Sequence, residues 1–369
     1  MTFRILAAGW LAVLVALPVA AHCAEAEPVG SPFGQKVICM DVPRFFSDYS
    51  LDERLVNCTA AIASGQFQGE ELAWLYIDRG TYHLRGKDLD RSIEDYSSAI
   101  ATKPDSALAF ADRGAIYYLQ GKLDLALADL DRAVALNPGN SNARLNRCKV
   151  YRRKAQYDLA LTDCNMAVTL DPRNPLVYQD RANLFEEQKL DPQAKADFSR
   201  EISLDPSAAP GYRGRAKLEM FSGDYAAAVN DFSLEIRHGP INAGAYHMRC
   251  LARAFAKEDF EDGLADCNRY IGQFPSVAGY FARGYLELQF GHYAEAIQDF
   301  DRADECHCAL ARYGRGLAKR GARDETGAAA DLAAAIALSP AVEKEFSNPE
   351  TLFSRGISTS VATKFTDSP

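Results

Sequence analysis

The chain has 369 residues, of which 48% are hydrophobic and 25% are charged, the composition of an ordinary globular protein. Its 41 lysines and arginines are outnumbered by 50 aspartates and glutamates, which gives a net charge of −9. This balance has the wrong sign for a protein that binds nucleic-acid phosphates or anionic lipid, so nucleic acid is excluded as the expected partner.

Residues 1–26 are predicted to be a cleaved secretory signal. An apolar run from Ile5 to Ala21, interrupted by Pro18, leads into small residues that end at Ala26. The run is shorter than the roughly 20 residues that span a bilayer, and no second apolar run follows it. The sequence therefore predicts a periplasmic protein with no transmembrane span in its mature chain. Cleavage after Ala21 keeps Cys23, whereas cleavage after Ala26 removes it.

Residues 27–72 are expected to form an N-terminal segment that ends in a capping half-repeat. Within it, the stretch from Leu51 to Ser64 has Val56, Cys58 and Ile62 at roughly helical spacing. This spacing favours an amphipathic helix, which would cover the exposed apolar face of whatever follows it.

A period of 34 residues runs through most of the remaining chain. Five prolines stand at this interval, namely Pro104, Pro138, Pro172, Pro206 and Pro240. Because proline cannot continue a helix, each one marks the end of the second helix of a repeating unit. A period of this length indicates a stacked array.

Two columns of small residues and one column of mostly larger residues recur in phase with the prolines. The first small column is Gly80, Gly114, Cys148, Ala182, Ala216, Cys250, Gly284 and Gly316. The second is Ser92, Ala126, Ala160, Ala194, Ala228, Gly263, Ala296 and Ala328. The larger column is Tyr96, Leu130, Cys164, Phe198, Phe232, Cys267, Phe300 and Leu332. Since small residues let two helix axes approach to about 8 to 10 Å, each unit is predicted to be a helix hairpin.

These columns resemble the signature of the tetratricopeptide repeat, as in the series Gly80, Ser92, Tyr96, Ala99 and Pro104. Eight units cover residues 73–342, with one extra residue between Ala256 and Asp262. The resemblance implies an all-α fold, an α-α superhelical solenoid of eight helix hairpins with helical caps. Residues 343–369 would supply a C-terminal capping helix and a tail.

Every unit also has an arginine before its first small residue and an aspartate before its larger residue. The arginines are Arg79, Arg113, Arg147, Arg181, Arg215, Arg249, Arg283 and Arg315. The aspartates are Asp95, Asp129, Asp163, Asp197, Asp231, Asp266, Asp299 and Asp331. We predict that each arginine reaches an aspartate of its own or an adjacent unit. The alternative is a row of cationic hooks for an acidic partner.

Two units carry cysteine at both the small and the larger position: Cys148 with Cys164, and Cys250 with Cys267. Facing positions on antiparallel helices can bring Cα atoms within the roughly 5.5 Å that a disulfide needs. In an exported protein we therefore predict two disulfides, each worth roughly 3 kcal/mol for a loop of about 15 residues. A pair of reduced core thiols is the alternative.

Cys39 and Cys58 are predicted to form a third pair, which would tie the N-terminal segment to its capping helix. Cys306 and Cys308 flank a histidine. A structural disulfide is the first interpretation of this second pair, although a bond across one residue is strained and easily reduced. A redox-active pair and a soft-metal site are the alternatives, and the geometry is poor for a zinc tetrahedron.

The resemblance implies that the first helices of successive units line a concave groove that binds a protein or peptide. On these helices the third unit is basic and the later units are aromatic. The candidate partner-binding residues are Lys149, Arg152, Arg153, Phe221, His247, Phe255, Phe281 and Tyr285. Such a surface suits an extended peptide with an acidic end and apolar anchors. Alternatively, the aromatic residues pack between units and the charges form a solvated face.

The sequence contains no Gly-x-Ser-x-Gly elbow, His-Glu-x-x-His helix or Gly-Lys-Ser/Thr phosphate loop. We therefore expect no catalytic residues, no cofactor and no metal. The leading interpretation is a periplasmic scaffold that binds a protein or peptide partner. One alternative is a thiol-redox or metal-handling factor centred on Cys306 and Cys308, and another is a constitutive subunit of an envelope or export assembly. The oligomeric state is not predicted.

Overall fold

The computed structural model describes residues 35–36, 39, 49–240, 242–304 and 308–352. The predicted signal at residues 1–26 and the tail from residue 353 onward lie outside these ranges. None of the helices in the described ranges is long and apolar enough to cross a membrane. The chain forms two compact blocks, Met1–Pro138 and Gly139–Pro369, and each is described by itself.

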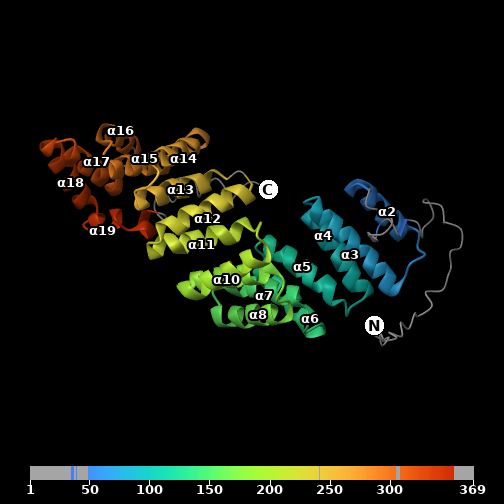
Figure 1. Cartoon of the computed structure of the whole chain (residues 1–369). Helices are drawn as coiled ribbons and strands as arrows, with labels where there is room; N and C mark the ends of the chain where they lie inside the picture. The colour runs from blue at the N-terminus through green and yellow to red at the C-terminus, as the bar shows by residue number, and fades with distance from the viewer. Residues whose placement is uncertain (1–34, 37–38, 40–48, 241, 305–307, 353–369) are drawn as a thin grey trace, which may run out of the picture. The chain divides into compact units, whose positions relative to one another are not determined.

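The described part of the first block is a helix followed by two hairpins (Figure 1). Its helices are α2 (Leu51–Ala63), α3 (Gly69–Arg85), α4 (Leu89–Thr102), α5 (Ala107–Leu119) and α6 (Leu123–Leu136). Helix α2 packs against α3 and starts with a capping box, in which Ser50 and Glu53 satisfy each other's backbone amides. It lies where the sequence predicts the half-repeat.

The described part of the second block stacks six hairpins and ends in a short helix. Its first four hairpins are α7 (Ser141–Arg153) with α8 (Tyr157–Leu170), α9 (Pro175–Glu187) with α10 (Asp191–Leu204), α11 (Ala209–Ser222) with α12 (Tyr225–His238), and α13 (Ala243–Ala256) with α14 (Phe260–Gln273). Then follow α15 (Val277–Phe290) with α16 (Tyr293–Ala303), α17 (Ala309–Gly321) with α18 (Glu325–Leu338), and α19 (Val342–Phe346). The predicted all-α solenoid of eight hairpins is confirmed.

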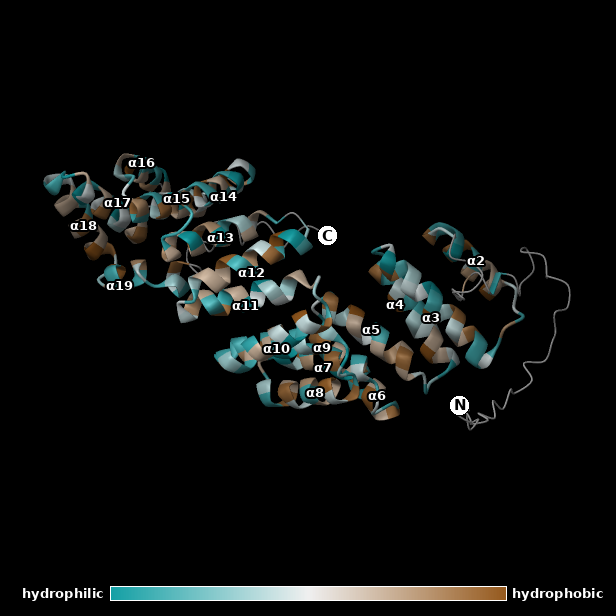
Figure 2. Ribbon diagram, in the orientation of Figure 1, coloured by the Kyte–Doolittle hydropathy of each residue, from teal (hydrophilic) through white to brown (hydrophobic). Residues whose placement is uncertain are grey.

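The small columns explain why the two helices of a hairpin pack so closely. A Cβ atom at Gly114 would lie 2.9 Å from Cγ of Leu130 on the partner helix, so no larger residue fits there. The larger column fills the space that the small residues leave, and Tyr96, Phe198 and Phe232 are fully buried. Hydrophobic and hydrophilic residues are interleaved along the helices (Figure 2), as expected when one face of each helix packs inward.

Each hairpin turns through one residue in the left-handed backbone region. These residues are Lys87, Gly121, Ala155, Lys189, Gly223, Lys257, Gly291 and Arg323, with φ between 54° and 83°. The extra residue of the sixth unit falls in such a turn, where Asp259 also has a positive φ of 53°. The slip in the repeat is therefore absorbed between α13 and α14, and both helices keep their register.

Candidate partner-binding site

All eight arginine and aspartate pairs form, and each lies within one hairpin. The shortest nitrogen-to-oxygen distance in every pair is between 2.5 and 2.7 Å. The aspartates are buried, and in each pair Nε and Nη2 of the arginine donate to the two carboxylate oxygens. The predicted ladder is confirmed, and its bidentate geometry is the strong form of this contact.

The third nitrogen of the arginine reaches the preceding hairpin, which the sequence analysis missed. Nη1 of Arg113 donates to Ser97 Oγ at 2.9 Å, and Nη1 of Arg181 donates to Asn165 Oδ1 at 2.8 Å. The same contact joins Arg249 to Ser233, Arg283 to Asn268 and Arg315 to Asp301. The acceptor always stands two residues after the ladder aspartate, so this signal was present in the sequence as a further polar column.

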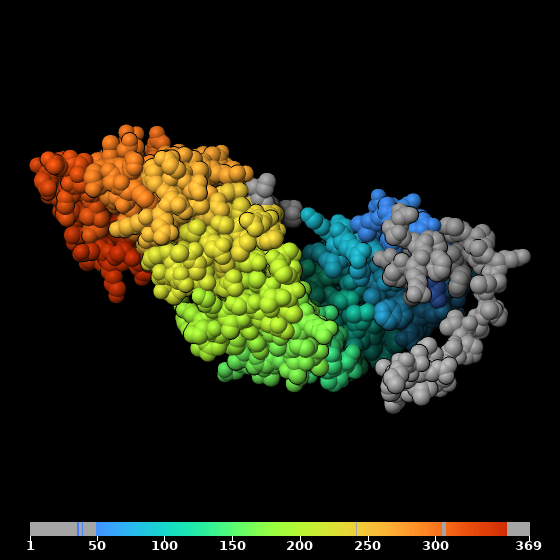
Figure 3. Space-filling view, viewed as in Figure 1, coloured from blue at the N-terminus to red at the C-terminus, as the bar shows by residue number. Residues whose placement is uncertain are grey.

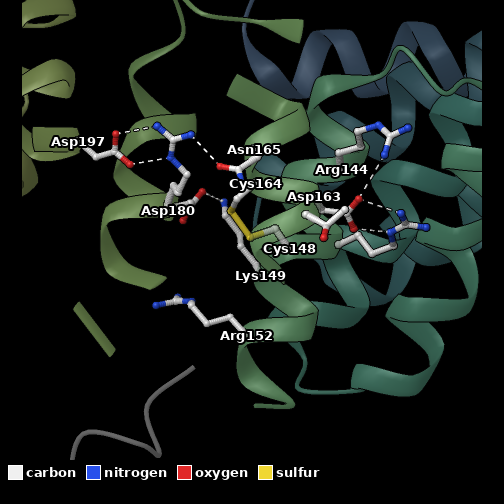
Figure 4. The surroundings of a disulfide bond; sticks show 12 residues. Arg144, Cys148, Lys149, Arg152, Asp163, Cys164, Asn165, Asp180 and Asp197 are labelled. Atoms are coloured by element: carbon white, nitrogen blue, oxygen red, sulfur yellow. Dashed lines mark hydrogen bonds and ion pairs between the residues drawn. A yellow bond between two sulfur atoms is a disulfide. The ribbon is translucent and has the colours of Figure 1, made fainter. Parts of the chain in front are cut away.

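Six cysteines form three disulfides in the structure. The Cα atoms are 5.6 Å apart in both Cys148–Cys164 and Cys250–Cys267, and 4.8 Å apart in Cys39–Cys58. These distances lie in the normal range for disulfides. Figure 4 shows Cys148–Cys164 joining the two helices of one hairpin beside the ladder aspartate Asp163. Oxidation of these cysteines in the cell stays a prediction.

The predicted bond between Cys306 and Cys308 lies partly outside the described residues and stays a prediction. Cys308 carries a free, half-buried thiol, while Cys306 lies outside the described residues. Within the described ranges, no group of three histidine, cysteine, aspartate or glutamate residues is placed to hold a metal ion.

The basic residues predicted to attract an acidic partner have acidic neighbours instead. Nζ of Lys149 lies 3.0 Å from Asp180 (Figure 4), and Nη1 of Arg152 lies 2.9 Å from Glu187. Arg153 follows in the last turn of α7. Asp180 and Glu187 come from the next hairpin and compensate part of the positive charge of Lys149 and Arg152. Binding of a partner by these basic residues stays a prediction.

The predicted aromatic anchors differ in their exposure. His247, Phe281 and Tyr285 are buried, and the ring of Phe255 stacks on Tyr225 at a centroid distance of 5.2 Å. Phe221 is half-buried on α11. Of these five residues, Phe221 and His247 line a cavity of the second block.

The C-terminal segment covers Phe281 and Tyr285. Phe346, at the end of α19, packs its ring 6.0 Å from the ring of Phe281 and 5.2 Å from that of Tyr285. Leu352 is buried in the same core. The two aromatic residues therefore serve a contact within the chain, which corrects their assignment as anchors for a partner. Within the second block, the side chains of successive hairpins lie against one another on the face shown in Figure 3.

A cavity of about 840 Å³ lies among the hairpins from α9 to α14. Helix α13 packs on α15, whereas α11 makes few direct contacts with α9 and with α13. Small residues at Gly244 and Ala245 on α13 leave the space unfilled. Phe221, Leu218 and Met248 supply apolar wall.

Charged side chains in this cavity form pairs. Nε of the exposed Arg213 donates to Glu235 Oε1 at 2.5 Å, and Lys217 donates to Glu186. At the edge, Nζ of Lys189 lies 2.7 Å from Glu350 of the C-terminal segment. Burial raises the pKa of the Glu235 carboxyl, and interactions with Arg213 and with the Asn242 side chain partly offset that rise.

Two buried polar groups of the cavity have unused hydrogen-bonding capacity. Oε2 of Glu235 and both ring nitrogens of His247 have no hydrogen-bond partner. Both residues are 3% exposed. Burial lowers the pKa of His247 to about 4, so its ring is neutral at pH 7. Since buried polar atoms are normally satisfied, these atoms call for a ligand or ordered water.

A family model described as tetratricopeptide repeat matches residues 77–141, 120–175 and 252–307. The chain is a tetratricopeptide-repeat protein. No curated protein sequence matches it.

Solved structures of tetratricopeptide-repeat proteins share the fold. PilF of Pseudomonas aeruginosa is 20% identical with a TM-score of 0.52, covering 56% of this chain and 94% of PilF. PilW, described as a widely conserved type IV pilus biogenesis factor, is 16% identical with a TM-score of 0.51, covering 55% of this chain and 94% of PilW. At these identities the likeness shows the fold alone.

One position of the repeat is unusual in two consecutive hairpins, at Glu235, which lines the cavity, and at Glu201, which does not. Glu201 and Glu235 stand four residues after a ladder aspartate, where the sixth hairpin has Tyr270 and the other five have alanine. A carboxylate in place of a core alanine needs room on the next helix, and a Cβ at Gly211 would lie 3.0 Å from the carboxylate of Glu201.

Proposed function

We propose that this protein is an exported scaffold that binds a protein or peptide partner on the face formed by its first helices, without catalysis. The observation that carries the proposal is the cavity of the second block. The first helices of three consecutive hairpins, α11, α13 and the end of α9, contribute to it, together with buried polar atoms that lack partners. Tetratricopeptide-repeat folds generally serve as non-catalytic scaffolds, which supports this choice.

Export to the periplasm is part of the same proposal. The predicted signal at residues 1–26 supports it, and so do the three disulfides, because such bonds persist in oxidising compartments. PilW is described as a pilus biogenesis factor. That description is the reason to keep a constitutive subunit of an envelope assembly as the second candidate.

Site-specific photo-crosslinking in intact cells tests the proposal. A crosslinking amino acid at Met248, inside the cavity, is expected to capture one discrete protein. The matched control is Leu159, an exposed residue on the second helix α8, which should capture nothing specific. Equal products from both positions, or none from either, would contradict partner binding at this face. Co-purification of the partner without crosslinking would favour the constitutive subunit.

A further inference from the structure

Two residues of the cavity of the second block, Glu235 and His247, have side-chain polar atoms without a hydrogen-bond partner. The three cations of the cavity each have an anion, in the pairs Arg213–Glu235, Lys217–Glu186 and Lys189–Glu350. Each of those contacts uses one oxygen of its carboxylate. In Glu235 the second oxygen is buried and has no partner. An unpaired carboxylate oxygen in a buried place is costly unless a donor or a positive charge reaches it.

His247 adds an acceptor to the same cavity. Its neutral ring has one nitrogen that accepts and one that donates, and neither has a partner. The ring is held in place by Tyr270, whose centroid is 4.7 Å away. Glu235 comes from α12 and His247 from α13, so the two groups approach the cavity from consecutive hairpins.

The walls of the cavity suit a long side chain with an apolar stem. Phe221 and Met248 are half-buried and Leu218 is buried. Lysine and arginine pack their methylene stems on such surfaces and place the charge at the far end. A volume of about 840 Å³ also leaves space for neighbouring residues of an extended segment.

We propose that this cavity is a specificity pocket for a cationic side chain, arginine or lysine, of the extended partner segment, with Glu235 and His247 as the residues that accept its hydrogen bonds. The inference rests on the proposed function and adds the chemistry of the partner. Arginine suits the pocket better than lysine, because its planar fork of five donors can reach two acceptors at once. The partner is thus recognised by a basic residue, whereas the sequence alone suggested an acidic one.

Two pools of short acetylated and amidated peptides with randomised flanks test this inference on the full mature chain. One pool has arginine at its central position, and the other has citrulline, which keeps the shape of arginine without the charge. Binding is measured by competition against a fluorescent arginine peptide. We expect the arginine pool to bind about tenfold more tightly, the usual gain from a hydrogen bond to a charged group.

The variant Glu235→Gln keeps the shape of the side chain and an oxygen for Arg213, and it is expected to abolish the preference for arginine. The matched control is Glu201→Gln. Glu201 stands at the same repeat position one hairpin earlier, is buried, and also has an unpartnered Oε2, but it is not part of the cavity lining. Glu201→Gln should keep the preference, and melting curves of both variants separate lost binding from lost folding.

Three outcomes overturn the pocket: no preference for arginine in the wild type, an undiminished preference in Glu235→Gln, or an equal loss in both variants. A preference that emerges only after deletion of residues 353–369 assigns the cavity to the chain's own tail and also overturns the proposal. If the Met248 crosslink to a partner persists in Glu235→Gln, the pocket fails and the scaffold function stands. If the wild type crosslinks nothing, the scaffold function itself fails.

Discussion

At the scale of single residues, the ladder pairs differ from ordinary surface ion pairs in their burial. The side chain of Asp197 is 9% exposed and that of Arg181 is 19% exposed. By contrast, the side chains of Lys189 and Glu350 are 73% and 53% exposed. Removal of one partner from a buried pair leaves a charge that neither water nor protein compensates, so the two kinds of pair should respond differently to mutation.

We expect Asp197→Asn to lower the free energy of unfolding by about 2 to 4 kcal/mol, because it leaves Arg181 without its bidentate acceptor. Glu350→Gln, which breaks the exposed pair, should cost at most about 0.5 kcal/mol. Urea unfolding followed by circular dichroism measures both. If both variants lowered the free energy of unfolding by similar amounts, burial would not strengthen the ladder pairs.

A second residue-scale prediction concerns pH. Burial, with smaller contributions from Asp180 and Asp205, raises the pKa of Glu201 from 4.5 to about 8. The folded state therefore binds this proton more tightly than the unfolded state. The resulting stabilisation is complete below pH 4.5 and is lost as the pH rises through about 8.

Glu201→Gln has no proton to lose at this site, so its stability should depend less on pH. The difference in unfolding free energy between the variant and the wild type should shift in favour of the variant from pH 5 to pH 8. Urea unfolding at both pH values measures it, with Glu350→Gln as the control for exposed carboxylates. Parallel pH curves for wild type and Glu201→Gln would contradict the raised pKa.

At the scale of elements, each hairpin depends on a turn residue in the left-handed backbone region. Ala155 has a φ of 55°, whereas the equivalent residue of the preceding hairpin is Gly121 with a φ of 73°. Alanine pays a steric cost in this region that glycine does not. We expect Ala155→Gly to raise the unfolding free energy by about 0.5 to 1 kcal/mol, and Gly121→Ala to lower it by a similar amount. Thermal melting of the two variants should shift in opposite directions.

The disulfide between α7 and α8 gives a further element-scale prediction. Replacement of both Cys148 and Cys164 by alanine should cost roughly 3 kcal/mol, because it frees a short loop in the unfolded chain. One sample of exported protein is alkylated directly and a second is alkylated after reduction. Mass spectrometry is expected to find Cys148 and Cys164 alkylated only in the reduced sample. Free thiols at both positions before reduction would show that the pair is a reduced core pair.

At the scale of the whole molecule, the second block contains its own extended core. One cluster of buried side chains runs from Ala216 to Leu352 and includes Phe232, Phe300 and Phe346. In a solenoid, stability is approximately a sum over hairpins and the interfaces between neighbours. A chain that begins at Gly139 should therefore melt cooperatively and keep the arginine preference. An unfolded product would show that residues before Gly139 are needed to fold it.

The sequence predicted those parts of the fold that repeat in phase. The hairpins, the ladder and the facing cysteines each recur at fixed spacing, so one unit supports the interpretation of the next. The departures from the repeat were harder to interpret. The positions of Glu235 and Phe346 depend on which side chains meet across hairpins, and periodicity carries no information about a C-terminal segment that packs Phe346 against Phe281. The compensation of Lys149 by Asp180 was missed for the same reason.

The contacts that Nη1 of the ladder arginines makes have a direction. Arg113, Arg181 and Arg249 each reach back to the second helix of the hairpin before them. When the chain is made or exported with its amino terminus first, the acceptor for each new hairpin therefore lies on a hairpin that has already formed. Docking can then proceed in the order of synthesis or export, without waiting for residues still to come.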